Sequence, residues 1–443
     1  MDVLAVPGQT VDTVLVAGAV AAAGALGVVA VRHAPRMAFA VWLLVLCLVP
    51  VWAGVSIVLD WEPEVLVTLV VLAVLVSLRP RDGARLVGQL TLADGVVALF
   101  VLAGLVPIAT GATSISDVFV LVAQWTGAFL VGRLIGQRVG LHWVYGAVAV
   151  AFTIVAVLAL VEFATGWNPF VQIPGQGRLY VDWAPIQERG GRPRAEGAFG
   201  HSIALGASLA LAVPLTLAAP FRAAVRVPMA VLLVAAAAVT FSRVGLATAV
   251  FGIALCVVFL RSGLSTRVRV VVTAGLVVVG AAFASLLSGV FAAAGSEATD
   301  SAGYRWALLE LVPDIELFGR SSSAYGLASG ERFFGGFRSI DNALLLLGLR
   351  YGWVPLVLVG VLLLAACAHV LRGRATAPTI AVVAQIPSFV SVALITQYAT
   401  LLWFVAGLAV YSQSVARKGT ESARNGSAAE VGPSPEMVRT PVA

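Results

Sequence analysis

The chain of 443 residues is 60% hydrophobic and only 11% charged, with a mean hydropathy of +0.99 and a net charge of +6. A water-soluble globular domain needs a far more charged surface, so this composition excludes that class and indicates an all-α polytopic membrane protein. The basic residues lie mostly in short loops between apolar runs, so the positive charge is a signal of membrane topology and predicts no nucleic-acid partner. Cys47, Cys256 and Cys367 fall inside apolar runs, and no disulfide framework is expected.

Apolar runs long enough to cross a hydrocarbon core of roughly 30 Å recur along the chain and predict about 12 to 13 transmembrane helices. The predicted spans are 14–31, 37–59, 65–78, 92–108, 118–131, 143–164, 202–217, 228–241, 244–260, 270–290, 342–371, 378–395 and 399–411. We expect no signal peptide, because the residues before the first span include Asp2 and Asp12 and no basic residue. Residues 1–415 are predicted to form one integral membrane domain, and the polar residues 416–443 a disordered cytoplasmic tail.

Arginines in the short loops predict the orientation, because positive residues are retained on the cytoplasmic side of a membrane. The basic residues on this predicted cytoplasmic side are Arg32, Arg36, Arg79, Arg81, Arg85, Arg133, Arg138, Arg222, Arg226, Arg261, Arg267, Arg269, Arg372, Arg374, Arg417 and Lys418. The intervening short loops are neutral or carry Asp60, Glu62 and Glu64. We therefore predict a multi-pass protein of the cytoplasmic (inner) membrane, with its N-terminus outside and its C-terminus in the cytoplasm.

Further arginines fall on the predicted outer side, many of them in two long outer loops, 166–200 and 291–341. These outer arginines are Arg178, Arg189, Arg192, Arg194, Arg243, Arg305, Arg320, Arg332, Arg338 and Arg350. We interpret Arg178, Arg189 and Arg332 as solvated loop residues.

Three of the outer arginines, Arg194, Arg243 and Arg305, adjoin apolar spans. A lone guanidinium there is costly without an anionic partner, and guanidinium groups pair well with phosphate oxygens. These residues predict a diphosphate-binding site at the outer leaflet.

Four short motifs follow one another in the last three-fifths of the chain. They are residues 194–199 before the span at Ser202, residues 241–245 between two spans, residues 304–308 in the second outer loop, and residues 341–342 with Gly352 in the following span. They resemble the Arg-x-x-Gly-x-Phe, Ser-Arg-x-Gly, loop-arginine and His-Asn or Asp-Asn segments of the O-antigen ligase and polymerase superfamily of bacterial envelope glycosyltransferases.

The resemblance implies a GT-C-like architecture and glycan transfer from a polyprenyl-diphosphate-linked oligosaccharide to a sugar hydroxyl, without a nucleotide sugar, a metal or another cofactor. Fixed arginines near the departing diphosphate stabilise its charge, and we predict this role for Arg194 and Arg243 first. The residues predicted to bind the substrate are Arg194, Arg243, Arg305, Arg350, Asn342 and Glu196.

A general base is needed for the acceptor hydroxyl, and two candidates stay open. Asp341 stands where ligases are expected to have histidine, and its competing role is to cap the helix that starts at Asn342. His201 is the only histidine on the predicted outer side, and its alternative is a residue at a helix start without chemistry.

Arg350 follows Asn342 by only about 12 Å of helix and is flanked by Gly348 and Gly352. The segment is either a broken, cavity-facing first half of a long span or a place where the arginine reaches out to the interface.

A few other polar residues fall within or beside the spans. Asp94 is interpreted as a marker of a shorter helix, Glu162 as a cavity-lining residue, and Gln385 and Gln397 as bridges between helices. Residues 305–317 predict an amphipathic interfacial helix.

Because Asp341 replaces the histidine expected of ligases, the sequence favours an inverting exopolysaccharide or O-antigen-type polymerase, located in the bilayer, with a chain-length regulator as a further possible partner. A ligase that transfers glycan to a lipid or protein is the first alternative. A flippase for lipid-linked oligosaccharides is the alternative from another class, and it needs polar residues along a path open to both sides. A peptidoglycan polymerase of the shape, elongation, division and sporulation type is a further alternative.

Overall fold

The computed structural model describes residues 34–56, 59–77, 90–260, 264–293, 295, 303–327 and 332–430, with side chains as far as residue 418. Within these ranges, six helices are long and apolar enough to cross a membrane: Leu92–Thr110, Ile115–Val139, Leu141–Thr165, Thr266–Ala293, Trp353–Leu371 and Thr396–Lys418. Six shorter apolar helices accompany them: Pro35–Leu48, Pro63–Val76, Ser202–Leu217, Ala223–Val239, Arg243–Phe259 and Ala377–Phe389. The chain therefore has the helical architecture of a polytopic membrane protein.

The helices follow one another with few other elements between them. In chain order they are α2 (Pro35–Leu48), α3 (Pro63–Ser77), α5 (Leu92–Leu105), α6 (Ile115–Phe119), α7 (Gly127–Val139), α8 (Leu141–Thr165), α9 (Gly177–Trp183), α10 (Ser202–Leu217), α11 (Ala223–Val239), α12 (Arg243–Phe259), α13 (Thr266–Ala293), α15 (Ala343–Tyr351), α16 (Trp353–Leu371), α17 (Ala377–Ala384), α18 (Ile386–Phe389) and α19 (Thr396–Glu430). A π-helix, η3 (Val120–Thr126), joins α6 to α7.

Short elements fill the loops. The 3₁₀-helices are η1 (Val51–Ala53), η2 (Val106–Thr110), η4 (Pro169–Gln172), η5 (Gly197–Phe199) and η6 (Leu308–Asp314). Three antiparallel two-stranded hairpins pair β1 (Val55–Ser56) with β2 (Asp60–Trp61), β3 (Glu188–Arg189) with β4 (Arg192–Pro193), and β5 (Ala324–Gly326) with β6 (Arg332–Phe334).

The hydropathy prediction of the spans agrees with these helices. Each predicted span from residue 37 onward overlaps an apolar helix, and the predicted span 14–31 lies outside the described residues. The predicted span 342–371 is two helices, α15 and α16, which meet at Gly352 with φ of 95°. The interpretation of this segment as a broken span is thus confirmed.

Two further predictions differ from the structure in extent. The interfacial helix predicted at 305–317 is helical over 303–314 and becomes a 3₁₀-helix at Leu308, with Trp306 exposed. Helix α19 continues to Glu430, although the sequence predicts disorder from residue 416; residues 431–443 lie outside the described ranges.

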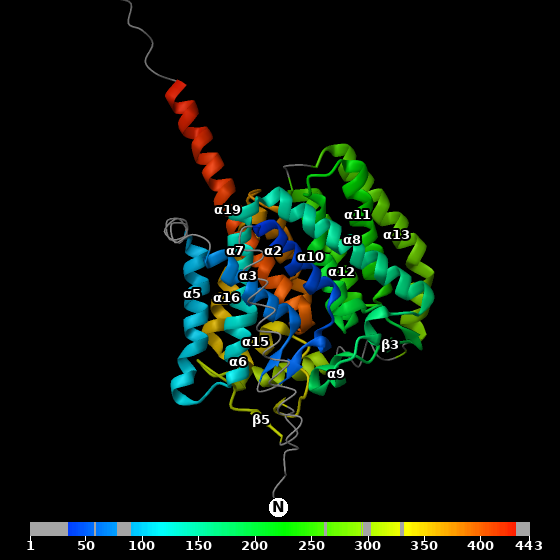
Figure 1. Ribbon diagram of the computed structural model, residues 1–443, viewed down its shortest axis with the longest axis vertical. Coiled ribbons are helices and arrows are strands. Elements are labelled where there is room, and N and C mark those ends of the chain that lie inside the picture. The colour runs from blue at the N-terminus through cyan, green and yellow to red at the C-terminus, as the bar shows by residue number, and fades with distance from the viewer. Residues whose placement is uncertain are drawn as a thin grey trace, which may run out of the picture.

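The elements between the helices gather at one end of the bundle. Figure 1 shows β5, α6 and α9 at one end of the molecule and the last turns of α19 beyond the other. We call the first end the long-loop face; it is formed by the three hairpins, α6 and α9.

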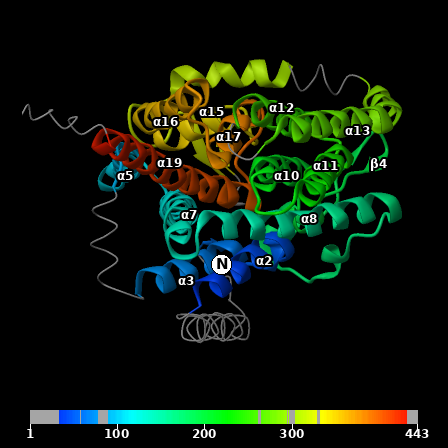
Figure 2. The ribbon, with the colours of Figure 1, turned by 90° about the horizontal axis from the view of Figure 1, so that it is seen from above.

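Helix α10 is the centre of the bundle. It packs against α8, α11, α12, α17 and α19, and all of its residues except Ile203 are buried. Figure 2 shows it surrounded by these helices. A helix that is apolar on every side is typical of the interior of a large bundle, and α10 positions the residues at its long-loop end.

A buried ion pair joins α5 to α7 near the opposite face. Arg133 donates from Nε to Asp94 Oδ1 at 3.0 Å and from Nη2 to Asp94 Oδ2 at 3.1 Å, and the two side chains are 1% and 8% exposed. Asp94 also completes the capping box of α5 with Thr91. The helix starts at Leu92 and is not shortened at Asp94; the aspartate instead completes the cap of α5 and balances a buried guanidinium.

We predict that Arg133→Met destabilises the protein by about 3 to 5 kcal/mol, because it leaves the Asp94 carboxylate buried without its partner. Unfolding in mixed micelles measures the loss. The double variant Asp94→Asn/Arg133→Met removes both charges and is expected to recover most of it. Equal stability of the single and double variants would contradict the ion-pair interpretation.

Candidate functional site

The first motif holds the long loop against the turn between α11 and α12. Arg194 is 6% exposed and donates from Nε to the carbonyl of Thr240 at 2.9 Å and from Nη1 to Gln187 Oε1 at 3.4 Å. The amide of Ala195 donates to the carbonyl of Val239 at 3.3 Å. Arg194 thus contacts the protein's own oxygens, and these contacts give it a clear architectural role.

Glu162, at the end of α8, anchors the same motif from the other side. Its carboxylate accepts from the amide of Gly197 at 2.9 Å, from the amide of Glu196 at 3.2 Å and from Asn168 Nδ2 at 2.9 Å. The Glu162 carboxylate, which the sequence suggested as part of a cavity lining, instead accepts hydrogen bonds from the backbone of the loop.

Glu196 and His201 lie beside Arg194, and both are largely withdrawn from water. Glu196 is 2% exposed and accepts from the amide of Gln187 at 3.1 Å. Burial raises the pKa of Glu196 to about 7, although its hydrogen bonds and Arg194 oppose the shift. Burial and then Arg194 lower the pKa of His201 to about 4.

His201 is the N-cap of α10. Its Nδ1 accepts from the amide of Ile203 at 3.1 Å, so in this arrangement the ring is neutral and its acceptor nitrogen is already used. A general base needs a free acceptor, and the geometry therefore favours the capping role for His201.

The second motif is a tight helix start. Ser242 caps α12 by accepting from the amide of Gly245 at 3.0 Å, and a Cβ on Gly245 would lie 3.0 Å from the Cα of Gly206 in α10. Arg243 is exposed, and its guanidinium lies over the ring of Phe291, 4.4 Å from the centroid. The serine and glycine of the motif serve packing, and the arginine faces outward.

The third and fourth motifs meet at the start of α15. Arg305 donates from Nη2 to the carbonyl of Ser391 at 3.4 Å, and its buried Nε has no hydrogen-bond partner among the described residues. The Tyr304 hydroxyl donates to the carbonyl of Ser339, whose own hydroxyl donates to Asp341 Oδ1 at 3.0 Å. Burial and then Asp341 raise the pKa of Tyr304.

Asn342, not Asp341, caps α15, because its Oδ1 accepts from the amide of Leu345 at 2.9 Å. The capping interpretation of Asp341 is wrong, and its carboxylate stays half-exposed in the loop. Asn342 therefore has a structural task at the start of α15.

A different group of charges gathers at the other end of α15. Asp117, with a side chain 2% exposed, receives Arg320 Nη2 on Oδ2 at 2.5 Å and Arg332 Nη1 on Oδ1 at 3.2 Å, and Arg350 Nε lies 3.9 Å from Oδ1. We call these four residues the Asp117 cluster. Arg350 is the only residue of the predicted site that belongs to it.

Local structure places each member of the cluster. Ser114 caps α6 and donates its hydroxyl to Asp117 Oδ2 at 2.5 Å. The amides of Gly319, Arg320 and Ser321 donate to the carbonyls of Tyr351, Ala112 and Leu349, respectively. The β5–β6 hairpin carries Arg332, which pairs with Gly326, and the last turn of α15 carries Arg350.

The cluster has an excess of positive charge. Three guanidinium groups face one carboxylate, which leaves two positive charges, and the three arginine side chains are 30%, 37% and 27% exposed. Burial and then repulsion from Arg350, Arg320 and Arg178 lower the pKa of Arg332, while Asp117 opposes this. An anion that reaches these solvent-accessible guanidinium groups relieves the repulsion.

The cluster shows which residues the sequence interpretation missed. Arg332 and Arg189 are not the solvated residues we predicted: Arg332 binds Asp117, and Arg189 Nη1 donates to the carbonyl of Phe241 at 2.7 Å. A signal for Asp117 was present, because it is a lone acid directly before a predicted span. Nothing local in the sequence relates it to Arg320 or Arg332.

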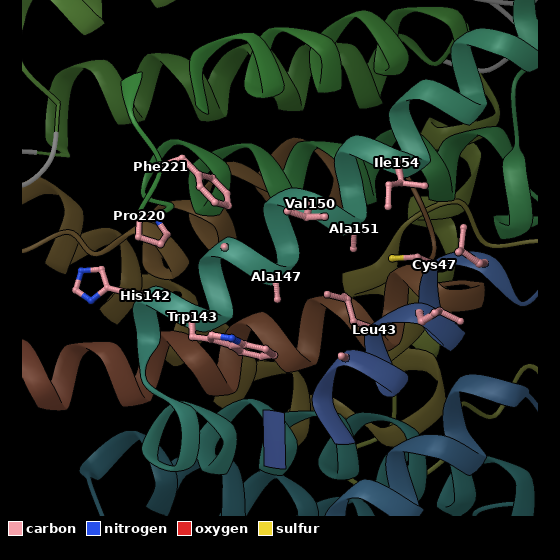
Figure 3. Close-up of a pocket in the computed structure, with 14 residues that line it drawn as sticks. Leu43, Cys47, His142, Trp143, Ala147, Val150, Ala151, Ile154, Pro220 and Phe221 are labelled. Atoms are coloured by element: carbon pink, nitrogen blue, oxygen red, sulfur yellow. The ribbon is translucent and has the colours of Figure 1, made fainter. Parts of the chain in front are cut away.

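An apolar groove of about 470 Å³ lies elsewhere, between α2, α8 and the turn before α11. Figure 3 shows Leu43 and Cys47 of α2 on one side and Ala147, Val150 and Ala151 of α8 on the other. Its lining is almost wholly apolar, which suits hydrocarbon chains and provides little for chemistry. Within the described ranges, His, Cys, Asp and Glu side chains form no group of three or more that would hold a metal ion.

Comparison of the chain with protein-family models, with curated proteins and with solved structures finds no match in any of the three. The class that the fold defines is a helical polytopic membrane protein with a basic cluster on its long-loop face.

We predict that stability falls as pH rises from about 4.5 to about 7 because of Glu196. Its folded-state pKa lies above the unfolded value, so the folded protein holds the proton more tightly and loses this advantage as the carboxyl ionises, at a cost of about 3 kcal/mol. Glu196→Gln is expected to remove this part of the pH dependence and to be the more stable protein at pH 8. The exposed Glu188→Gln is the control, and a wild-type pH profile in the Glu196 variant would contradict the prediction.

Proposed function

We propose that this protein transfers a glycan from a polyprenyl-diphosphate-linked donor to a sugar hydroxyl at its long-loop face, as an inverting exopolysaccharide or O-antigen-type polymerase. The observation that carries the proposal is the Asp117 cluster, whose two surplus positive charges match the two negative charges of a diphosphate diester.

In this proposal the cluster meets the headgroup of the lipid-linked donor at the end of the apolar helices. Asp117 lies in the first turn of the apolar helix Ile115–Val139, which is long enough to span a membrane, and Arg350 lies just before the break that leads into α16. A headgroup at the end of these helices meets the arginines while its lipid chain stays in the bilayer.

The chemistry needs charge stabilisation at the leaving group. When the bond from the anomeric carbon to the diphosphate oxygen breaks, its electron pair stays on that oxygen, and guanidinium groups held in place lower the barrier. Arg350, Arg332 and Arg320 are held by Asp117 and by backbone structure, so little reorganisation is required. In this proposal Arg194 holds its loop against the turn at Thr240, and Arg243, which lies over Phe291, takes no part in binding the diphosphate.

The β5–β6 hairpin, which carries Arg332, also presents two stacked aromatic rings. Tyr325 is 50% exposed and stacks on Phe333, with ring centroids 5.4 Å apart. Phe333 follows Arg332 in β6, so the two rings lie on the face of the hairpin opposite to the Arg332 side chain. An exposed ring with a polar edge suits contact with a sugar, which favours a glycan over a simple lipid phosphate.

A first test uses purified protein and polyprenyl-diphosphate oligosaccharide without a nucleotide sugar. We expect release of polyprenyl diphosphate together with lengthening of the glycan. Arg350→Gln and Arg320→Gln are each expected to slow transfer by about 100-fold, since each removes a donor to the leaving group. The exposed loop variant Arg192→Gln is the matched control. Full activity in both cluster variants would rule out this site, and transfer to a lipid or protein acceptor alone would favour a ligase.

A second prediction concerns binding alone. A short-chain polyprenyl diphosphate without sugar is expected to raise the melting temperature of the detergent-solubilised protein, and added salt is expected to weaken the effect. The Arg320→Gln and Arg350→Gln variants are expected to lose most of this stabilisation. A shift that is equal in all variants would place the diphosphate elsewhere.

A further inference from the structure

Two carboxyl groups lie together at the start of α3, and no role has been assigned to them. Glu64 is fully buried, and apart from the carboxyl group of Glu62 its carboxylate oxygens have no side-chain hydrogen-bond partner among the described residues. Its neighbour is the carboxyl group of Glu62, whose Oε2 accepts from Gln124 Nε2 at 3.1 Å. The two carboxyl groups therefore form a pair in which Glu62 is held by Gln124 and Glu64 has no other side-chain partner among the described residues.

Such a pair holds a proton between its members. Two carboxylates in contact and away from water repel strongly, so one proton is retained and shared. Burial raises the pKa of Glu62 well above its ordinary value, and Glu64 and then Asp60 raise it further. With one proton bound, the pair still has a carboxylate oxygen that can accept a second proton.

The pair is close to the Asp117 cluster. The ring of Trp61, next to Glu62, contacts the ring of Phe119, with centroids 4.7 Å apart, and Phe119 is two residues beyond Asp117. Gln124 follows Asp117 by seven residues, roughly 10 Å of helix. Helix α9 packs on β1, which pairs with β2 directly before Glu62.

The π-helix η3 lies between the two groups. It covers Val120–Thr126 and carries Gln124, which is 6% exposed. A π-helical turn has a wider backbone than the α-helix and is frequent at functional sites. Here it presents the amide that holds Glu62.

We propose that Glu62 is the general base that takes the proton of the acceptor hydroxyl, and this rests on the proposed glycan transfer. The acceptor O–H bond breaks and its proton moves to a Glu62 carboxylate oxygen. The acceptor oxygen bonds to the anomeric carbon, and the carbon–oxygen bond to the diphosphate breaks with its electron pair on the diphosphate. Glu62 then returns the proton to water.

Inversion requires that the base and the diphosphate site are separate groups, as they are in this proposal. The attacking hydroxyl and the leaving group occupy opposite faces of the sugar, so the base and the diphosphate site must be several ångströms apart. The paired groups of inverting glycosidases are about 6.5 to 9.5 Å apart for the same reason. Glu64 acts through Glu62 and is a positioning residue that keeps the shared proton.

The test separates binding from transfer in three variants: Glu62→Gln, Glu64→Gln and Asp60→Asn. Asp60 is exposed and bonded by Ser56, and it is the matched control for a lost acid in the same hairpin. Glu62→Gln is expected to slow transfer by about 100-fold or more while the stabilisation by polyprenyl diphosphate stays at the wild-type level. Glu64→Gln is expected to shift the rising limb of the pH profile of transfer to higher pH, because the Glu62 carboxylate then loses the shared proton that stabilises it in the singly protonated pair.

The outcomes distinguish the two proposals. Transfer at the wild-type rate in Glu62→Gln, with loss in Arg350→Gln, would overturn the role of Glu62 and leave the glycan transfer standing. An unchanged pH profile in Glu64→Gln would remove the shared proton from the mechanism. Absence of transfer by the wild-type protein would overturn both proposals. A melting curve of Glu62→Gln without ligand, compared with that of Asp60→Asn, shows that any loss of transfer is not a loss of folding.

Discussion

The attraction between the Asp117 carboxylate and the guanidinium groups around it is the interaction on which the long-loop face depends. A carboxylate that is 2% exposed has lost its hydration, and ion pairs and hydrogen bonds must replace it. The replacements come from the 316–321 segment, the β5–β6 hairpin and the end of α15. One buried acid thereby brings three distant parts of the chain together and leaves a surplus of positive charge where they meet.

The four motifs that resemble the O-antigen ligase and polymerase superfamily have clear structural roles in the fold. Arg194 joins a loop to a turn, Ser242 and Gly245 allow α12 to approach α10, and Asn342 starts α15. Such duties do not argue against catalysis, since an active site needs its supports held firmly. The contacts of Arg194 show that a motif arginine can stabilise the fold as well as bind a substrate.

The helices could be predicted from the sequence, because a chain inside a bilayer has to satisfy its backbone internally and therefore forms helices wherever it is apolar. The helix break at Gly352 could also be predicted from the sequence, because glycines flank Arg350. The Asp117 cluster could not be predicted from the sequence. Asp117 and Arg332 are 215 positions apart, and such a pairing leaves no period or spacing in the sequence. Loop arginines are usually solvated, and this general tendency gave the wrong interpretation of Arg332 and Arg189.

Gly352 sets the direction of α15 relative to α16, because its lack of a side chain allows the break between them. A methyl group at this position would lie 2.7 Å from both the carbonyl oxygen of Leu317 and the Cα of Phe318, and the backbone there has φ of 95°. Any other residue would favour one continuous helix from α15 into α16, which would move Arg350 away from the Asp117 carboxylate. The arrangement of the Asp117 cluster thus depends on one glycine, and an uncharged substitution there would separate charges that it does not contact.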